Sequence, residues 1–251
     1  MLDSELLLSF ADRFFGYGDL TAPIWFIGME EGGGGEENIR KRLETWDLRG
    51  RRQLEDLAGY HEAMVFENLT SKKRVSIQPT WEKLIYFQMA AEGDAPTREG
   101  VRAFQKSILG RENSSTCVVE LMPLPKKSAA SWPYGGWTDV PELWSRSLYF
   151  AHFAVKRATA LRQLIADHRP RVVVFYGKSP EFSCHWPWIA GVKLSNWNSR
   201  GDGWCDTARE GVQYMFAPHP VAHGSRNEVW RNMGTGMSDL IEVNRPACFS
   251  S

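Results

Sequence analysis

The sequence predicts an α/β fold with three layers, in which helices cover both faces of a central, mostly parallel, four-stranded sheet. Four short apolar runs carry this prediction, and they are led by Ile24, Val118, Val172 and Tyr214. Continuous apolar runs are typical of parallel strands that are buried on both faces, and the segments between them have helical or polar character. The 251 residues are 43% hydrophobic, which suffices for one large core. We therefore expect residues 1–251 to form a single domain.

Local sequence patterns predict the individual helices and strands. The apolar residues Leu6, Phe10 and Phe14 have helical spacing, Thr80 is a suitable N-cap, and Pro123 should end the second strand. We expect helices over residues 3–16, 36–58, 80–91, 97–109, 140–168 and 225–243. We expect strands over residues 23–27, 117–122, 171–176 and 213–217. Residues 187–209 are rich in loop-forming residues, and we expect neither a helix nor a strand there.

Composition excludes several classes of protein. No apolar run reaches the roughly 20 residues of a membrane helix, and residues 1–10 lack the basic start of a signal peptide. We therefore expect a cytoplasmic protein with no membrane partner. The four cysteines form no C-x-x-C pair, which favours isolated thiols over a disulfide framework or a metal site. A net charge of zero argues against broad, charge-driven nucleic-acid binding but allows a local groove for DNA.

In a parallel sheet the functional site lies at the carboxyl ends of the strands. Here those ends fall at residues 28–35, 120–125, 177–180 and 218–226. The first segment begins G-M-E-E-G and lacks both the dinucleotide fingerprint and the phosphate-loop lysine. A flexible turn, a phosphate loop and carboxylate chemistry remain open for it. In the last segment, His219 follows a strand and precedes a helix, whose positive end suits an anion.

Together, residues 28–32 (G-M-E-E-G) and 219–223 (H-P-V-A-H) resemble two motifs of the uracil-DNA glycosylase superfamily. That family has G-x-[DN]-P-[YG] after its first strand and an H-P-S-P-type segment after its last. Residues 119–124 (V-E-L-M-P-L) are similar to the family segment in which an Asn recognises the base. The branches that carry G-M-N-P-G are the most similar. The resemblance implies a uracil-DNA-glycosylase-like fold, DNA as partner and no cofactor or metal, and we expect a monomer.

The resemblance also implies roles for individual residues. Glu30 and His219 would be catalytic, and Glu120 would recognise the base. The base would also be contacted by Gly28, Met29, Glu31 and Gly32, and an aromatic ring from Trp132 or Tyr134 would stack on it. Contacts to DNA would come from His223, Ser225, Arg226, Lys126, Lys127 and Ser179.

The sequence departs from the family at four positions. Glu30 stands where the family has Asp or Asn, and Glu31 replaces the Pro. Gly32 stands where the strict uracil enzymes have a Tyr that blocks substituents at C5 of the base. Glu120 stands where the family has the base-recognising Asn. An open side at Gly32 therefore allows a substituent on C5.

The change at Glu120 bears on the substrate. Uracil offers an N3–H donor and an O4 acceptor, which an amide matches, whereas an ionised carboxylate can only accept. Cytosine offers an amino donor and an N3 acceptor, so a protonated Glu120 would match both positions. The alternative interpretation makes Glu120 a surface or salt-bridged residue.

The expected function is therefore excision of a 5-modified cytosine, hydroxymethylated or glucosylated. The resemblance implies a setting in defence against phage. A uracil- or hydroxymethyluracil-type repair glycosylase and a catalytically inert DNA-binding relative are the alternatives.

Overall fold

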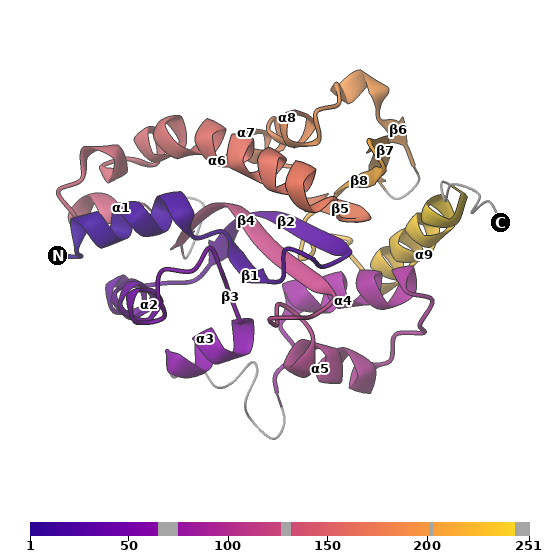
Figure 1. Cartoon of the computed structure of the whole chain (residues 1–251), viewed down its shortest axis with the longest axis horizontal. Coiled ribbons are helices and arrows are strands. Elements are labelled where there is room, and N and C mark those ends of the chain that lie inside the picture. The colour runs from indigo at the N-terminus through magenta and orange to yellow at the C-terminus, as the bar shows by residue number, and fades with distance from the viewer. Residues whose placement is uncertain (65–74, 127–131, 201–202, 244–251) are drawn as a thin grey trace.

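The computed structural model has helices on both sides of a central sheet (Figure 1). It describes residues 1–64, 75–126, 132–200 and 203–243, with side chains up to residue 238. Figure 1 shows α1 (Ser4–Arg13) and α6 (Arg146–His168) on one side, and α4 (Pro79–Ala91) and α9 (Asn227–Val243) on the other. The predicted α/β class, with helices covering both faces of a sheet, is confirmed.

The four predicted strands lie side by side and parallel in the middle of the sheet. They are β2 (Ile24–Gly32), β4 (Thr116–Lys126), β5 (Val172–Tyr176) and β8 (Val212–Ala217). Their order is β4-β2-β5-β8, so the chain leaves the central strand β2 in one direction to form β4 and in the other to form β5. Such a change of direction opens a crevice at the carboxyl ends of the strands, and it places the expected functional site there.

The prediction that the sheet has four strands and is mostly parallel is wrong. Within the described residues the sheet has eight strands of mixed direction, in the order β3-β1-β4-β2-β5-β8-β7-β6. The additional strands are β1 (Gly16–Gly18), β3 (Leu54–Glu55), β6 (Asn198–Ser199) and β7 (Cys205–Arg209). Strand β1 is antiparallel to β4, and β7 is antiparallel to β8. Three of the additional strands have two or three residues, and β7 is mostly polar, so none has the apolar run by which a strand is predicted.

The remaining elements connect these strands. The helices are α2 (Glu36–Leu48), α3 (Leu57–Ala63), α5 (Arg98–Ser107), α7 (Pro180–Ser183) and α8 (Trp186–Ala190). Short 3-10 turns are η1 (Tyr134–Gly136), η2 (Pro141–Leu143) and η3 (Leu194–Asn196). None of the described helices is long and apolar enough to span a membrane.

Two predicted boundaries are wrong for identifiable reasons. Strand β4 continues through Pro123 to Lys126. Its pairing with β1 ends at Val119, so beyond that residue one edge of β4 has no ladder partner and tolerates a residue without an N–H. The predicted helix over residues 36–58 stops at Leu48, because the chain then turns through Gly50 and Arg51, both with positive φ. The helix α4 is capped by Gln78, not by Thr80.

The helices pack on the sheet through large side chains. Phe87 of α4 contacts Phe26 of β2 edge to face, with ring centroids 5.7 Å apart. On the other side, Trp186 of α8 stacks on Phe175 of β5 at 5.1 Å. These contacts bury both faces of the parallel strands and fix the positions of their carboxyl ends.

Candidate active site

A cavity of about 500 Å³ lies at the carboxyl ends of the parallel strands. Each of the four strands, or the segment directly after it, contributes to its lining through Glu30, Glu120, Tyr176 and His219. The volume is within the range of small-molecule sites, which is roughly 300–1,000 Å³. Three of the four segments that the sequence singled out, 28–35, 120–125 and 218–226, thus line one cavity. From β5 the lining residue is Tyr176, just before the fourth segment at 177–180.

Glu120 of β4 is packed tightly against Gly28 of β2 and Tyr176 of β5. Its Oε1 accepts a hydrogen bond of 2.9 Å from the Tyr176 hydroxyl on β5. Its Oε2 is buried and accepts no hydrogen bond from the described residues. A Cβ atom at Gly28 on β2 would lie 2.2 Å from this oxygen and 2.3 Å from the Tyr176 hydroxyl, so only glycine fits there. The interpretation of Glu120 as a surface residue is therefore wrong.

This environment changes the acidity of the carboxyl group. Burial, with smaller contributions from the charges of Glu31 and Glu30, raises the pKa of Glu120 to about 8, against the opposing effects of Tyr176 and Arg157. Near neutral pH the group is mostly protonated, and it can both donate and accept a hydrogen bond.

The pKa of Glu120 has a consequence for stability. As pH rises from the ordinary pKa of 4.5 towards about 8, the unfolded chain loses this proton while the folded chain keeps it. The contribution of Glu120 to stability should thus be present below pH 4.5 and be lost as pH rises through 8, by at most about 1.4 kcal/mol per pH unit. We expect Glu120→Gln to remove this slope. Urea unfolding of both proteins at pH 5 and pH 8 measures it, and an equal difference at both pH values would contradict the assignment.

Glu30 is held by two cations. Its Oε1 lies 2.8 Å from Lys126 Nζ, and its Oε2 accepts a bond of 2.9 Å from Arg146 at the start of α6. The side chains are 13% exposed for Glu30 and 3% for Lys126. Arg146 also pairs with Glu181 at 2.7 Å. Because each oxygen has a cationic partner, the Glu30 side chain is fixed in position.

Glu31 forms a separate ion pair. Arg42 of α2 donates to both of its oxygens at 2.9 Å, and the Tyr17 hydroxyl lies 3.3 Å from Oε1. Two parallel hydrogen bonds of this kind hold a carboxylate rigidly. Glu31 therefore lines the cavity with its charge already paired.

His219 lies in the turn after β8. Its Nδ1 accepts a bond of 3.3 Å from the Val221 amide, which places the proton of the neutral ring on Nε2. Burial lowers the pKa of His219, so the ring is neutral near pH 7. Its ring lies 6.2 Å from that of Tyr176. The cavity thus contains a neutral imidazole N–H donor beside the protonated Glu120.

An aromatic wall completes the cavity, and the sequence did not predict it. His61 of α3 stacks on Trp81 of α4, with centroids 6.0 Å apart, and contacts Tyr17 edge to face at 5.6 Å. Burial lowers the pKa of His61 to about 4, so this ring is neutral as well. Gln78, Thr80 and Val118 also line the cavity. Trp81 lies in the first turn of α4, directly after the predicted N-cap Thr80. This place at a predicted helix start is the signal by which the sequence could have indicated that Trp81 lines the site.

The predicted stacking aromatics are not brought into the cavity. Tyr134 is buried and donates to the Pro125 carbonyl at 2.8 Å, and Trp132 donates to the Leu143 carbonyl at 2.7 Å. Trp132 stacks on Tyr149 at 4.8 Å. Both side chains therefore support the segment between β4 and α6.

The other predicted residues are distributed around the site. Gly32 lines the cavity, and a Cβ atom there would meet nothing within 4 Å. Met29 lies against Gly177, outside the lining. Ser225 accepts a bond of 2.9 Å from the Trp230 indole and so positions α9. Solvent-exposed positions are occupied by Ser179, His223 and Arg226. Lys127 lies outside the described residues.

No family model matches the sequence, and a comparison with curated proteins finds no similar one. Within the described residues, no group of three or more His, Cys, Asp or Glu side chains is arranged to hold a metal ion. The site is therefore interpreted from its own chemistry.

Proposed function

We propose that the protein is a DNA glycosylase that binds a flipped-out base in this cavity and breaks its bond to the sugar. The observation that carries the proposal is the meeting of Glu30, Glu120 and His219, from three parallel strands or the turn after one, around a cavity of about 500 Å³. Flipping a base costs a few kcal/mol, least where the base pair is already weakened. The cavity supplies hydrogen-bonding groups and the aromatic wall of Trp81 and His61 to offset that cost.

The reaction assigns a different task to each side chain. As the C1′–N bond breaks, its electron pair goes to the base and positive charge develops on the sugar. Glu30 stabilises that charge, and the neutral His219 donates its Nε2–H to the base oxygen that becomes negative. Water then adds its oxygen to C1′, and its proton leaves to the solvent or the base. The two cations on Glu30 favour this electrostatic task over activation of the water, since both carboxylate oxygens already have partners.

A 5-modified cytosine is the proposed base. Protonated Glu120 has both a donor and an acceptor, which match N3 and the amino group of cytosine, and its Oε1 retains a lone pair beside the bond from Tyr176. The open space at Gly32 would take a substituent on C5, such as a hydroxymethyl group or its glucosylated form. The proposed setting is defence against phage DNA that contains such a base.

Exposed groups beside the cavity would hold the DNA strand. His223 and Arg226 precede α9, whose amino end also favours a phosphate. Lys178 and Ser179 follow β5 at the same edge of the sheet. Val221, 55% exposed, lines the cavity in the turn after His219 and could fill the vacated stack.

The direct test is an assay of base release. The protein is incubated with oligonucleotides that contain uracil, 5-hydroxymethylcytosine or its glucosylated form, and alkali then cleaves any abasic site. Release of a modified cytosine supports the proposal. Release of uracil alone would favour the repair glycosylase, and DNA binding without release of any base would favour the inert relative.

We expect His219→Ala to slow base release by about two to three powers of ten, the effect of losing one preorganised donor to a developing oxyanion. Single-turnover rates at saturating protein measure this effect without a contribution from binding. His185→Ala is a matched control, because that half-buried histidine does not line the cavity. An unchanged rate in His219→Ala would make the residue a structural part of the turn.

A further inference from the structure

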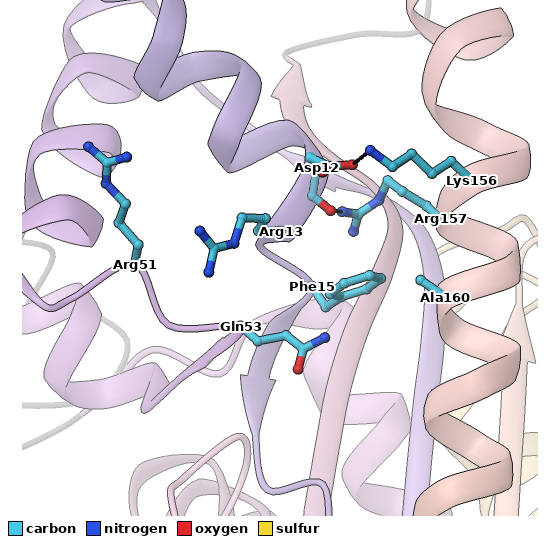
Figure 2. A pocket seen from close by; sticks show the side chains of 8 residues that line it. All are labelled: Asp12, Arg13, Phe15, Arg51, Gln53, Lys156, Arg157 and Ala160. Carbon is cyan, nitrogen blue, oxygen red and sulfur yellow. Dashed lines mark hydrogen bonds and ion pairs between the residues drawn. The ribbon is translucent and has the colours of Figure 1, made fainter.

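A second cavity, of about 370 Å³, lies between α1, the segment before β3 and α6 (Figure 2). It shares no lining residue with the candidate active site. The residues that line it are Asp12, Arg13, Phe15, Arg51, Gln53, Lys156, Arg157 and Ala160. Four of them are cations and one is a carboxylate, so the cavity has a positive electrostatic potential.

Arg157 provides the buried part of this charge. Its guanidinium is fully buried, and its partners among the described residues are all main-chain carbonyls: those of Leu121 at 2.5 Å, Glu120 and Ala11 at 3.0 Å, and Asp12 at 3.3 Å. The group lies 4.2 Å from the centre of the Phe15 ring. Burial lowers its pKa to about 10, which leaves it charged near neutral pH. Carbonyl groups solvate this cation but do not neutralise it.

The other cations lie around the same cavity. Arg13 forms no ion pair or side-chain hydrogen bond with the described residues, and it is exposed. Arg51 pairs with Asp47 at 2.6 Å, and Lys156 pairs with Asp12 at 2.5 Å. Both pairs are largely exposed, and exposed pairs contribute little to stability, so these side chains can turn to a ligand at small cost. Figure 2 shows Arg13 and Arg51 on one side of the cavity and Lys156 and Arg157 on the other.

We propose that this cavity binds a small phosphate-bearing molecule with at least two negative charges. The guanidinium groups of Arg13 and Arg51 can each donate paired hydrogen bonds to phosphate oxygens, and the Gln53 amide adds a further donor. The volume is at the lower end of the range for small-molecule sites, which favours a free anion over a long polymer. Phe15 and Ala160 provide an apolar wall beside the charges. This site is independent of the proposed glycosylase activity.

Calorimetric titration of the full chain with inorganic pyrophosphate and with ADP, at low ionic strength, tests the proposal. We expect saturable binding at one site. Arg13→Ala with Arg51→Ala should weaken it by about tenfold or more, since hydrogen bonds to a charged group are lost. Arg231→Ala is the matched control, because that arginine is exposed on α9 and lines neither cavity. No binding by the wild type, or equal binding by the double variant, would overturn the proposal.

Two further arms locate the bound anion. His219→Ala should bind pyrophosphate as tightly as the wild type, whereas weakened binding would place the anion in the candidate active site and overturn the proposal. A duplex oligonucleotide should bind the double variant and the wild type equally. If the double variant weakens duplex binding while the wild type fails to bind pyrophosphate, the cations serve the DNA backbone and the proposed small ligand is wrong.

Discussion

Glu30→Gln should lower base release by about three powers of ten or more while DNA binding survives. The substitution removes the one negative charge that Lys126 and Arg146 hold at the edge of the cavity. A neutral amide cannot stabilise the positive charge that develops on the sugar, and electrostatic stabilisation of this kind usually accelerates a reaction more than any other single effect. Single-turnover base release and a gel-shift titration with the same oligonucleotide measure the two properties separately.

The stability of the variant has to be measured beside its activity. Lys126 is almost fully buried, so loss of its partner carboxylate should cost about 3–5 kcal/mol of unfolding free energy. The double variant Glu30→Gln, Lys126→Met removes the unpaired charge, and we expect it to regain stability without activity. Glu181→Gln is a matched control that breaks the other ion pair of Arg146 and leaves Glu30 in place. Full activity in Glu30→Gln would remove this residue from the mechanism.

Glu120→Asn should shift the preference of the enzyme from a 5-modified cytosine towards uracil. The protonated carboxyl, with its Oε1 held by the Tyr176 hydroxyl, donates to N3 of cytosine and accepts its amino group. The shorter Asn amide is released from that bond, so it can turn its donor towards O4 of uracil. A mismatched base leaves buried polar groups unpaired on both sides, so the ratio of rates for the two bases should change by about two powers of ten or more. Competition between two labelled oligonucleotides in one reaction measures this ratio directly.

The asparagine is one methylene shorter, so a second variant separates recognition from packing. Glu120→Gln keeps the length, the bond from Tyr176 and a donor beside the acceptor oxygen, so it should retain the preference for the modified cytosine. Tyr176→Phe is the matched control for loss of that bond without a change in the group that faces the base. If Glu120→Asn lowers the rates on all bases equally, Glu120 shapes the cavity without recognising the base.

The central part of the fold could be predicted because its strands are buried on both faces. Residues 172–176 (VVVFY) have no charged position, and such a β-branched and aromatic run is typical of a strand inside a covered sheet. The outer strands could not be predicted in this way. Tyr17 is flanked by two glycines in a strand of three residues, and its pairing depends on main-chain atoms of β4, which are distant in sequence.

The site was predictable where it depends on strand ends. Glu30 lies near the end of β2 and His219 follows β8, so the topology brings them together. Glu120 joins them from the middle of β4, because this strand continues to Lys126. His61 and Trp81 come from helices whose approach to the cavity depends on packing angles that a sequence does not encode locally. Trp132 and Tyr134 were predicted to line the site but do not. An aromatic residue in a Gly/Pro-rich segment can be exposed on that segment or packed beneath it, and the sequence does not distinguish the two.

Arg157 has a consequence for how the chain reaches this structure. Its four main-chain bonds join α6 to the end of α1 and to β4, across sequence separations of 36 to 146 residues. The guanidinium can be satisfied only after these three segments have met, because earlier its desolvation would have no compensation. The full set of bonds should therefore form late in folding, after the rate-limiting barrier. Interactions of that kind slow unfolding more than they speed folding, so this one side chain should act mainly to prolong the lifetime of the native state.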